Sequence, residues 1–192
     1  MDGWLVVGLG NPGPGYAGHR HNLGAMVVGA LAEDSGIRLR PHKAGALVAE
    51  TRLEPPPADR TVLAVPTTYM NESGAPVAAL LKYYSLAVER LVVVHDDLDI
   101  PFGQVRLKLG GGEGGHNGLR SVSKVLATRA YLRVRVGIGR PPGRMDPADY
   151  VLRNFSAAER EELKLVVVDG ADATRLLLAR GLLDAQQVVH SR

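Results

Sequence analysis

Short apolar segments alternate with segments of helical periodicity along the chain, and this alternation limits the fold more than any other feature. Residues 4–9 and 91–95 are apolar at almost every position, which is typical of strands buried on both faces. Apolar residues recur at helical spacing from Asn22 to about residue 36, and helices are also predicted at about 72–84, 119–126 and 156–180. The alternation predicts an α/β fold in which one domain over residues 1–192 contains a mixed, largely parallel sheet flanked by helices.

A pair of further strands and a helix start are marked by local signals. Residues 46–52 and 61–65 have the composition of strands, and the proline-rich segment 53–60 between them predicts an exposed turn. We therefore expect these two strands to pair antiparallel. Near the other end of the chain, Ser156 and Glu159 have the spacing of a capping box that begins a long helix.

The composition excludes several classes of protein. The chain has no cysteine, so it cannot contain a disulfide, a thiol nucleophile, an iron–sulfur cluster or a cysteine-ligated zinc ion. Its first residues are not basic, and the apolar segment after them has only about six residues, which is not the pattern of a signal peptide. No apolar run approaches the roughly 20 residues that a membrane span needs. We expect a soluble, cytoplasmic protein without a membrane partner.

Positive charge is concentrated in one part of the chain. Residues 104–144 contain nine lysines and arginines but one acid, Glu113, so this window has a formal charge of +8 while the whole chain has +3. The strands predicted at 105–109 and 132–138 alternate apolar and basic residues, which places the basic side chains of each strand on one face. The charge indicates a polyanionic partner, unless these are scattered, solvated side chains.

Gly8, Gly10 and Gly13 match the spacing of a dinucleotide-binding fingerprint, but their context does not fit. The fingerprint opens a helix directly, and the prolines and glycines that follow here prevent one. The acid at the required distance, Asp34, ends a predicted helix instead of a strand. A structural turn is the better interpretation, and it leaves the polar Asn11 at the carboxyl end of the first strand.

Polar residues follow three predicted strands at the point where each strand ends. These residues are Asn11, Asn71 and Asp96. Ligands of open α/β sheets bind beyond the carboxyl ends of the strands, so we expect the three side chains to share one site. Asn71 alone could instead cap the next helix.

The acidic segment that contains Asp96 allows three interpretations. It could bind a metal ion, it could be a solvated turn, or one carboxylate could orient a histidine. The metal ligands would be His95, Asp96, Asp97 and Asp99, with His116 as a further candidate.

His21 begins the first predicted helix, where it either decorates an exposed helix terminus or acts as a general base near neutral pH. The glycine-rich loop 110–118 brings His116 and Asn117 to the start of another helix, an arrangement that favours anions. No cysteine and no G-x-S-x-G motif offers a covalent nucleophile. A histidine, a carboxylate and several carboxamides suit a base-activated water that hydrolyses an activated acyl bond such as an ester.

These residues belong to a longer series of motifs. The series comprises residues 8–13, Tyr16, residues 20–22 with Gly24, residues 69–71 with Ser73 and Gly74, His95, Asp96, Leu98 and Asp99, the loop through 116–118, and residues 136–141 and 150–152. In content and order the sequence resembles the bacterial peptidyl-tRNA hydrolases over residues 8–155. Enzymes of this family free tRNA from prematurely released peptidyl-tRNA.

The resemblance implies a role for individual residues. His21 would be the general base that activates water, and Asp96 would bind His21 and stabilise it as a proton acceptor. Asn11 would help to distinguish N-blocked peptidyl-tRNA from free aminoacyl-tRNA. The other substrate-binding residues would be Tyr16, Tyr69, Met70, Asn71, His116 and Asn117, and the tRNA phosphates would contact Arg106, Lys108 and Arg133.

The resemblance also implies a monomer that acts on peptidyl-tRNA and needs no metal or cofactor. Two positions depart from the family pattern. His19 stands where threonine is common, and this second imidazole could shift the pKa of the base. Glu113 places an acid in the glycine-rich loop, where it could weaken phosphate contact or pair with an arginine. The alternatives are a non-catalytic RNA-binding relative and a metallohydrolase that uses the acidic segment.

Overall fold

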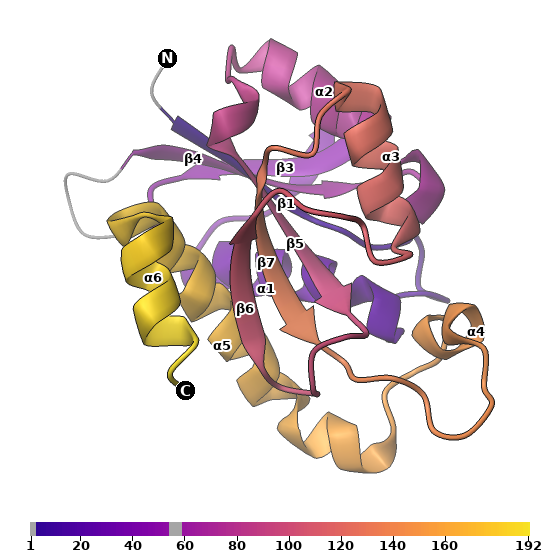
Figure 1. The fold of residues 1–192 in the computed structure, drawn as a ribbon. Coiled ribbons are helices and arrows are strands. Elements are labelled where there is room, and N and C mark those ends of the chain that lie inside the picture. Colours follow the sequence, from indigo (N-terminus) through magenta and orange to yellow (C-terminus); the bar gives the residue numbers. More distant parts are fainter. Residues whose placement is uncertain (1–2, 54–58) are drawn as a thin grey trace.

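The structure is a computed structural model that describes residues 3–53 and 59–192, and it contains a sheet covered by helices (Figure 1). The strands are β1 (Gly3–Gly8), β2 (Arg40–His42), β3 (Ala46–Thr51), β4 (Arg60–Pro66), β5 (Leu91–Asp97), β6 (Val105–Leu109) and β7 (Leu132–Gly137). The α-helices are α1 (Leu23–Asp34), α2 (Gly74–Tyr83), α3 (Asn117–Leu126), α4 (Pro147–Val151), α5 (Ala157–Arg180) and α6 (Leu182–Val189). Short 3₁₀ helices are η1 (Arg20–Asn22), η2 (Met70–Glu72) and η3 (Val88–Arg90).

The order of the seven strands in the sheet is β2-β3-β4-β1-β5-β7-β6. The central strands β4, β1, β5 and β7 are parallel, whereas β2, β3 and β6 pair antiparallel at the two sides. This confirms the predicted mixed sheet with a parallel centre. Because the four central strands run in one direction, their carboxyl ends lie along the same edge of the sheet.

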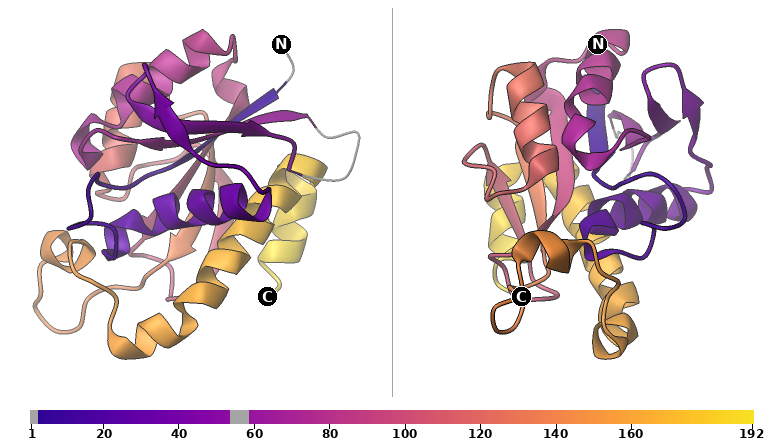
Figure 2. Two further views of the ribbon diagram at one scale, coloured as in Figure 1. Left: turned by 180° about the vertical axis from the view of Figure 1, so that it is seen from behind. Right: turned by 90° about the vertical axis from the view of Figure 1, so that its right-hand side faces the viewer.

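Helices cover both faces of this sheet. Helices α1, α5 and α6 lie on one face, and α2 and α3 lie on the other (Figures 1 and 2). Each face has its own buried apolar cluster: Val6 and Val92 point toward α1 and α5, whereas Leu5 and Val93 point toward α2 and α3. This division follows from the two-residue period of a strand, and it explains why residues 4–7 of β1 and 91–94 of β5 are apolar at every position.

Helix α1 approaches the sheet closely because two glycines remove the side chains that would separate them. A Cβ atom on Gly24 would collide with the carbonyl oxygen of Val94 in β5, and one on Gly8 would collide with the backbone of Gly24. The first glycine of the 8–13 motif therefore serves helix–sheet packing. The close contact also holds η1, which directly precedes α1, against the strand that carries Asp96.

Local predictions hold at most points. The antiparallel pairing of β3 with β4 is confirmed, although residues 54–58 of the predicted turn between them lie outside the described residues. The capping box of Ser156 and Glu159 is present. The loop 110–118 ends two residues earlier than predicted, because α3 begins at Asn117.

The sequence did not predict β2, α4 or α6. Helix α6 covers the edge strand β6: Gln186 donates a hydrogen bond to the carbonyl oxygen of Leu107 over 2.9 Å, and the amide of Leu107 donates to Nε2 of His190 over 2.9 Å. Side chains thus satisfy backbone groups that an edge strand would otherwise leave open. In the part of the chain that the structure describes, no helix combines the length and apolar character that a membrane span requires.

Candidate active site

The polar residues at the carboxyl ends of the central strands line one cleft, with a volume of about 640 Å³. All the residues predicted for catalysis or for binding the acyl end of the substrate contribute to it, namely Asn11, Tyr16, His21, Tyr69, Met70, Asn71, Asp96, His116 and Asn117. They come from four separate segments of the chain, which follow β1, β4 and β6 or end β5. The predicted convergence on one edge of the sheet is therefore confirmed.

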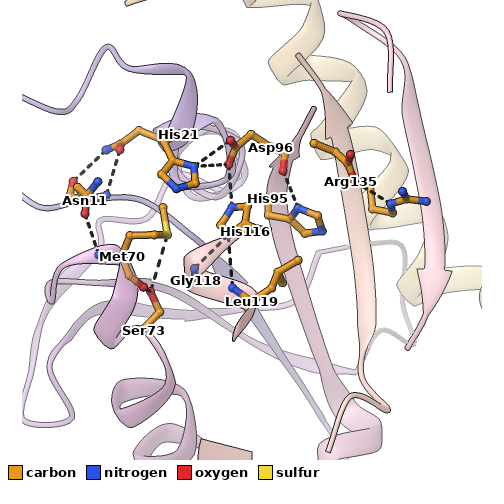
Figure 3. A network of polar contacts seen from close by, with 12 residues as sticks. Asn11, His21, Met70, Ser73, His95, Asp96, His116, Gly118, Leu119 and Arg135 are labelled. Carbon is orange, nitrogen blue, oxygen red and sulfur yellow. Dashed lines mark hydrogen bonds and ion pairs between the residues drawn. The ribbon is translucent and has the colours of Figure 1, made fainter. Parts of the chain in front are cut away.

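Asp96, at the end of β5, contacts two histidines (Figure 3). Nδ1 of His21 lies 2.9 Å from Oδ2 and 3.1 Å from Oδ1 of Asp96, and Nε2 of His116 lies 2.9 Å from Oδ1. All three side chains are buried. The contact between His21 and Asp96 is the predicted one. The contact of His116 was not predicted, because this residue was expected to bind substrate.

The tautomer of His116 follows from its position before α3. Its Nδ1 accepts hydrogen bonds from the backbone amides of Gly118 and Leu119, at 3.1 Å and 3.3 Å. The ring proton is therefore on Nε2, which donates to Asp96. The pKa of His116 lies below its ordinary value because burial disfavours the charged ring, despite the nearby charge of Asp96. His116 is thus a neutral donor whose orientation is fixed by the first turn of a helix.

Asp96 is ionised and so fixes the tautomer of His21. Burial favours the neutral carboxyl, but the charges and hydrogen bonds of His21 and His116 hold the pKa of Asp96 well below its usual range. A carboxylate can only accept, so Nδ1 of His21 carries the proton and Nε2 has the lone pair. Burial lowers the pKa of His21, yet the charge and hydrogen bond of Asp96 outweigh it, and the net shift is upward. His21 is an imidazole whose basicity is increased by a buried carboxylate.

Asn11 links two segments of the cleft. Its Oδ1 accepts a hydrogen bond from the amide of Met70 at 2.7 Å. The backbone of Asn11 is held in turn by Asn22, which accepts from its amide at 3.0 Å and donates to its carbonyl at 2.9 Å. The oxygen of the Asn11 carboxamide is therefore occupied, and its NH₂ group is the end available to a ligand. The positioning by Asn22 was not predicted, although Asn22 belongs to the 20–22 motif.

Arg20 connects the segment of the base to the C-terminal part of the chain. Its guanidinium lies 2.6 Å from Oε1 of Glu159, donates to the carbonyl of Tyr150 at 3.2 Å, and lies 3.9 Å from the centre of the Tyr150 ring. Glu159 also accepts from the amide of Ser156 in the capping box of α5. The sequence marked Glu159 only as a cap, because no local signal relates residues 139 positions apart.

The rim of the cleft is more open than its floor. Asn71 and Asn117 are exposed, and Tyr69 is 55% exposed, with the centre of its ring 6.2 Å from the centre of the Tyr16 ring. Across the cleft, the wall is formed by residues of α4 and by Leu152. A buried polar floor with an aromatic and apolar rim suits a ligand that has one reactive polar group and a larger, variable remainder.

The acidic segment does not gather as a metal site of the predicted composition. Asp97 pairs with Arg135 at 2.9 Å, and Asp99 pairs with Arg140 at 2.6 Å. His95 donates to the carbonyl oxygen of Asp96, and burial together with the proximity of His116 lowers its pKa to about 3.

Another trio of side chains lies closer together. Within residues 3–53 and 59–192, the group close enough to share one ion is His21, Asp96 and His116, with ligand atoms within 4.8 Å of one another. The ring nitrogens that face Asp96 are already engaged in hydrogen bonds to it. A metal ion in this position would have to replace both of these hydrogen bonds.

Strands β6 and β7 place their basic side chains on one face, as predicted, but Arg133 does not have the predicted function. Register pairs Arg106 with Arg135 and Lys108 with Arg133 across β6 and β7. Arg133, however, is 1% exposed, and it donates to the carbonyl oxygens of Gly111 and Gly112 at 3.0 Å and 2.6 Å. The glycine-rich loop folds over this side chain. The predicted phosphate contact of Arg133 is therefore corrected: its guanidinium holds the loop.

Two positions that depart from the family pattern also have defined surroundings. The ring of His19 packs edge-on against Tyr16 at 5.4 Å, and its backbone forms a bridge to Asn154. Glu113 pairs with Arg129 at 2.9 Å, which is one of the two outcomes expected for it.

Comparison with known proteins agrees with this geometry. The family model described as "Peptidyl-tRNA hydrolase" matches residues 5–192. The chain is 62% identical to a peptidyl-tRNA hydrolase of Frankia casuarinae, over 98% of this chain and 94% of the relative, and 57% identical to one of Kineococcus radiotolerans, over 99% and 98%. The crystal structure of peptidyl-tRNA hydrolase from Acinetobacter baumannii superposes with a TM-score of 0.88 at 35% identity, covering 97% of this chain and 93% of that one. The chain belongs to the peptidyl-tRNA hydrolase family.

Proposed function

We propose that the cleft carries out the reaction of this family, hydrolysis of the ester between the peptide and the 3′-terminal ribose of peptidyl-tRNA, with His21 as the general base. The observation that carries the assignment is the contact of His21 with the buried, ionised Asp96, which leaves Nε2 as the proton acceptor. The assignment uses no covalent nucleophile, in keeping with a chain that has no cysteine.

The reaction follows from this arrangement. Nε2 of His21 takes a proton from a water molecule as the water oxygen attacks the ester carbonyl carbon. The tetrahedral intermediate then breaks the bond from carbon to the ribose oxygen, and the imidazolium returns its proton to that oxygen. The products are the peptide acid and tRNA. Asp96 stabilises the imidazolium while it exists, because the carboxylate faces its Nδ1–H.

The carboxamides supply recognition without changing charge. The NH₂ group of Asn11 can donate to the carbonyl of a blocked amino terminus. A free ammonium group has only donors, so donor would face donor and binding would be weaker. Asn11 thereby favours N-blocked peptidyl-tRNA over aminoacyl-tRNA. Asn71 and Asn117 at the rim hold the acyl part and the attacking water, and Tyr16, Tyr69 and Met70 line the cleft near the 3′ end.

The test is peptide release from N-blocked aminoacyl-tRNA by the wild type and by His21→Ala, each with and without a chelator. We expect His21→Ala to lower turnover by roughly 10²–10⁴-fold, the usual contribution of a general base, and chelator to have no effect. His42→Ala, at the opposite side of the sheet on β2, is the matched control.

The other outcomes identify the alternatives. Full activity of His21→Ala would disprove its role. A wild type that binds tRNA without cleaving the ester would indicate the RNA-binding relative. Chelator-sensitive cleavage would indicate a metallohydrolase.

We also propose that the chain acts as a single-domain monomer in the cytoplasm. The cleft of a single chain already contains every residue to which the proposed reaction assigns a role, which supports a catalytic unit that needs no second copy. Sedimentation equilibrium at micromolar concentration checks this, and a dimer mass would contradict it.

A further inference from the structure

Glu113 lies between two hollows of the surface. It lines the catalytic cleft, and it also lines a neighbouring open basin of about 540 Å³ whose other charged residues are Arg120, Lys124 and Arg129. It is also the one acid of the basic window 104–144. A polyanion that extends from the cleft into the basin therefore has to pass this carboxylate.

The carboxylate of Glu113 is already paired. Oε1 lies 2.9 Å from Nε of Arg129, and the Glu113 side chain is 14% exposed while that of Arg129 is 64% exposed. The largely buried carboxylate of Glu113 thus binds the exposed guanidinium of Arg129. The hydrogen bond to Arg129 is the main reason that the pKa of Glu113 lies below its ordinary value, despite partial burial. Glu113 is accordingly ionised near neutral pH.

The backbone of the loop is held by groups other than this ion pair. Arg133 binds the carbonyl oxygens of Gly111 and Gly112, and the amide of His116 donates to the carbonyl oxygen of Glu113 at 2.9 Å. These contacts do not use the Glu113 carboxylate. Neutralising it should leave the loop in place and change mainly the charge of the basin.

We propose that Glu113 competes with an RNA phosphodiester for Arg129 and so sets how tightly RNA is held beside the cleft. In the free protein the carboxylate neutralises Arg129 and reduces the positive potential of the basin. When RNA binds, a phosphate takes the guanidinium, for which a bidentate contact is available. Glu113 then faces that phosphate as a like charge and lowers the affinity for RNA, product tRNA included. The inference rests on the proposed function, because it assumes an RNA substrate in the cleft.

The experiment measures the Kd of deacylated tRNA by fluorescence anisotropy at fixed salt. We expect Glu113→Gln to lower Kd by about two- to fivefold, the size of an exposed ion-pair contribution. Arg129→Gln should raise Kd by a similar factor, and Glu113→Gln should give a smaller gain when added to Arg129→Gln. Glu89→Gln, which makes the same charge change in η3 at the other end of β5, is the matched control and should give a smaller decrease.

A second variant separates charge from loop structure. Glu113→Asp keeps the charge on a shorter side chain, so it should not tighten binding. The proposal is overturned if Glu113→Gln weakens binding or changes it no more than Glu89→Gln, because Glu113 would then only brace the loop. It is also overturned if Glu113→Asp lowers Kd as much as Glu113→Gln does. The same holds if Glu113→Gln lowers Kd by its full factor in a protein that already carries Arg129→Gln. Failure of the proposed function would appear separately, as a wild type that does not release peptide.

Discussion

Two groups of polar and charged side chains lie next to each other in this protein and are positioned in different ways. In the cleft, Asp96 and its two histidines are short side chains at the end of a strand and at the starts of helices, so the backbone fixes where their polar atoms lie. On the basic face beside it, long arginines bind protein groups: Arg133 binds loop carbonyls and Arg135 binds Asp97. Catalytic geometry thus depends on backbone placement, whereas the direction of a long cation depends on which acceptors lie within its reach.

The largest expected effect is that of Asp96→Asn, which breaks the catalytic group at its centre. An asparagine cannot accept from both histidines without turning its NH₂ group toward one of them. We expect turnover in the peptide-release assay to fall by roughly 10²–10⁴-fold.

The pH dependence of Asp96→Asn gives a second reading. His21 must be neutral to act as a base, so activity falls as the pH falls through its pKa. Asp96 raises that pKa. Its removal should therefore move the acid limb of the pH–rate profile to lower pH. An unchanged acid limb would show that His21 does not sense Asp96.

A smaller effect is expected for His116→Asn, which tests whether the second histidine matters to the first. Asparagine is a good helix N-cap, so the cap is kept, and the loss of the buried hydrogen bond to Asp96 should lower the free energy of unfolding by about 1–3 kcal/mol. The shorter side chain does not reach Asp96, whose charge then acts on His21 alone. We expect roughly tenfold slower turnover and an acid limb moved to higher pH. An unshifted pH profile at full stability would leave His116 with a capping role only.

The next variant, Arg133→Gln, tests the other side of the comparison. The loss of the hydrogen bonds from a buried guanidinium to backbone carbonyls should lower the free energy of unfolding by about 1–3 kcal/mol, measured by urea titration. Amide exchange of the glycine-rich loop should become faster. The salt dependence of tRNA binding should stay as in the wild type, because Arg133 contacts protein. A shallower salt dependence would restore Arg133 as a phosphate contact.

The smallest effect is expected for Arg106→Gln. Arg106 is half-buried in β6, and its guanidinium donates to the carbonyl oxygen of Val105 and to the side-chain oxygen of Gln104. If it also contacts a tRNA phosphate, its loss should raise the Kd of tRNA by about two- to fivefold and reduce the slope of log Kd against log salt by roughly one. A raised Kd with an unchanged slope would exclude a phosphate contact.

The part of the site that could be predicted from the sequence is formed by residues at the carboxyl ends of strands. Asn11, Asn71 and Asp96 each follow or end a central strand, and parallel strands bring such residues together whatever the details of packing. Asn22, Arg20 and Glu159 were missed as positioning residues because their partners are 11 to 139 positions away and are reached only after the chain has folded. Helix α6 was missed because its hydrogen bond to the edge of β6 joins residues 79 positions apart, which no local periodicity reveals.

The sequence by itself determined the alternation of strands and helices, the polar edge of the sheet and the family to which the chain belongs. The spacing of apolar residues and the order of strands and helices are properties of residues close together along the chain, so they can be recognised without the folded structure. Only the tertiary structure decided that Asp96 binds two histidines, that the amides of α3 fix the tautomer of His116, and that Arg133 faces the loop instead of solvent. Apart from the local contact of His116 with α3, these are choices among partners that lie at least 20 positions apart in the chain, and the folded backbone sets which of them come within hydrogen-bonding distance.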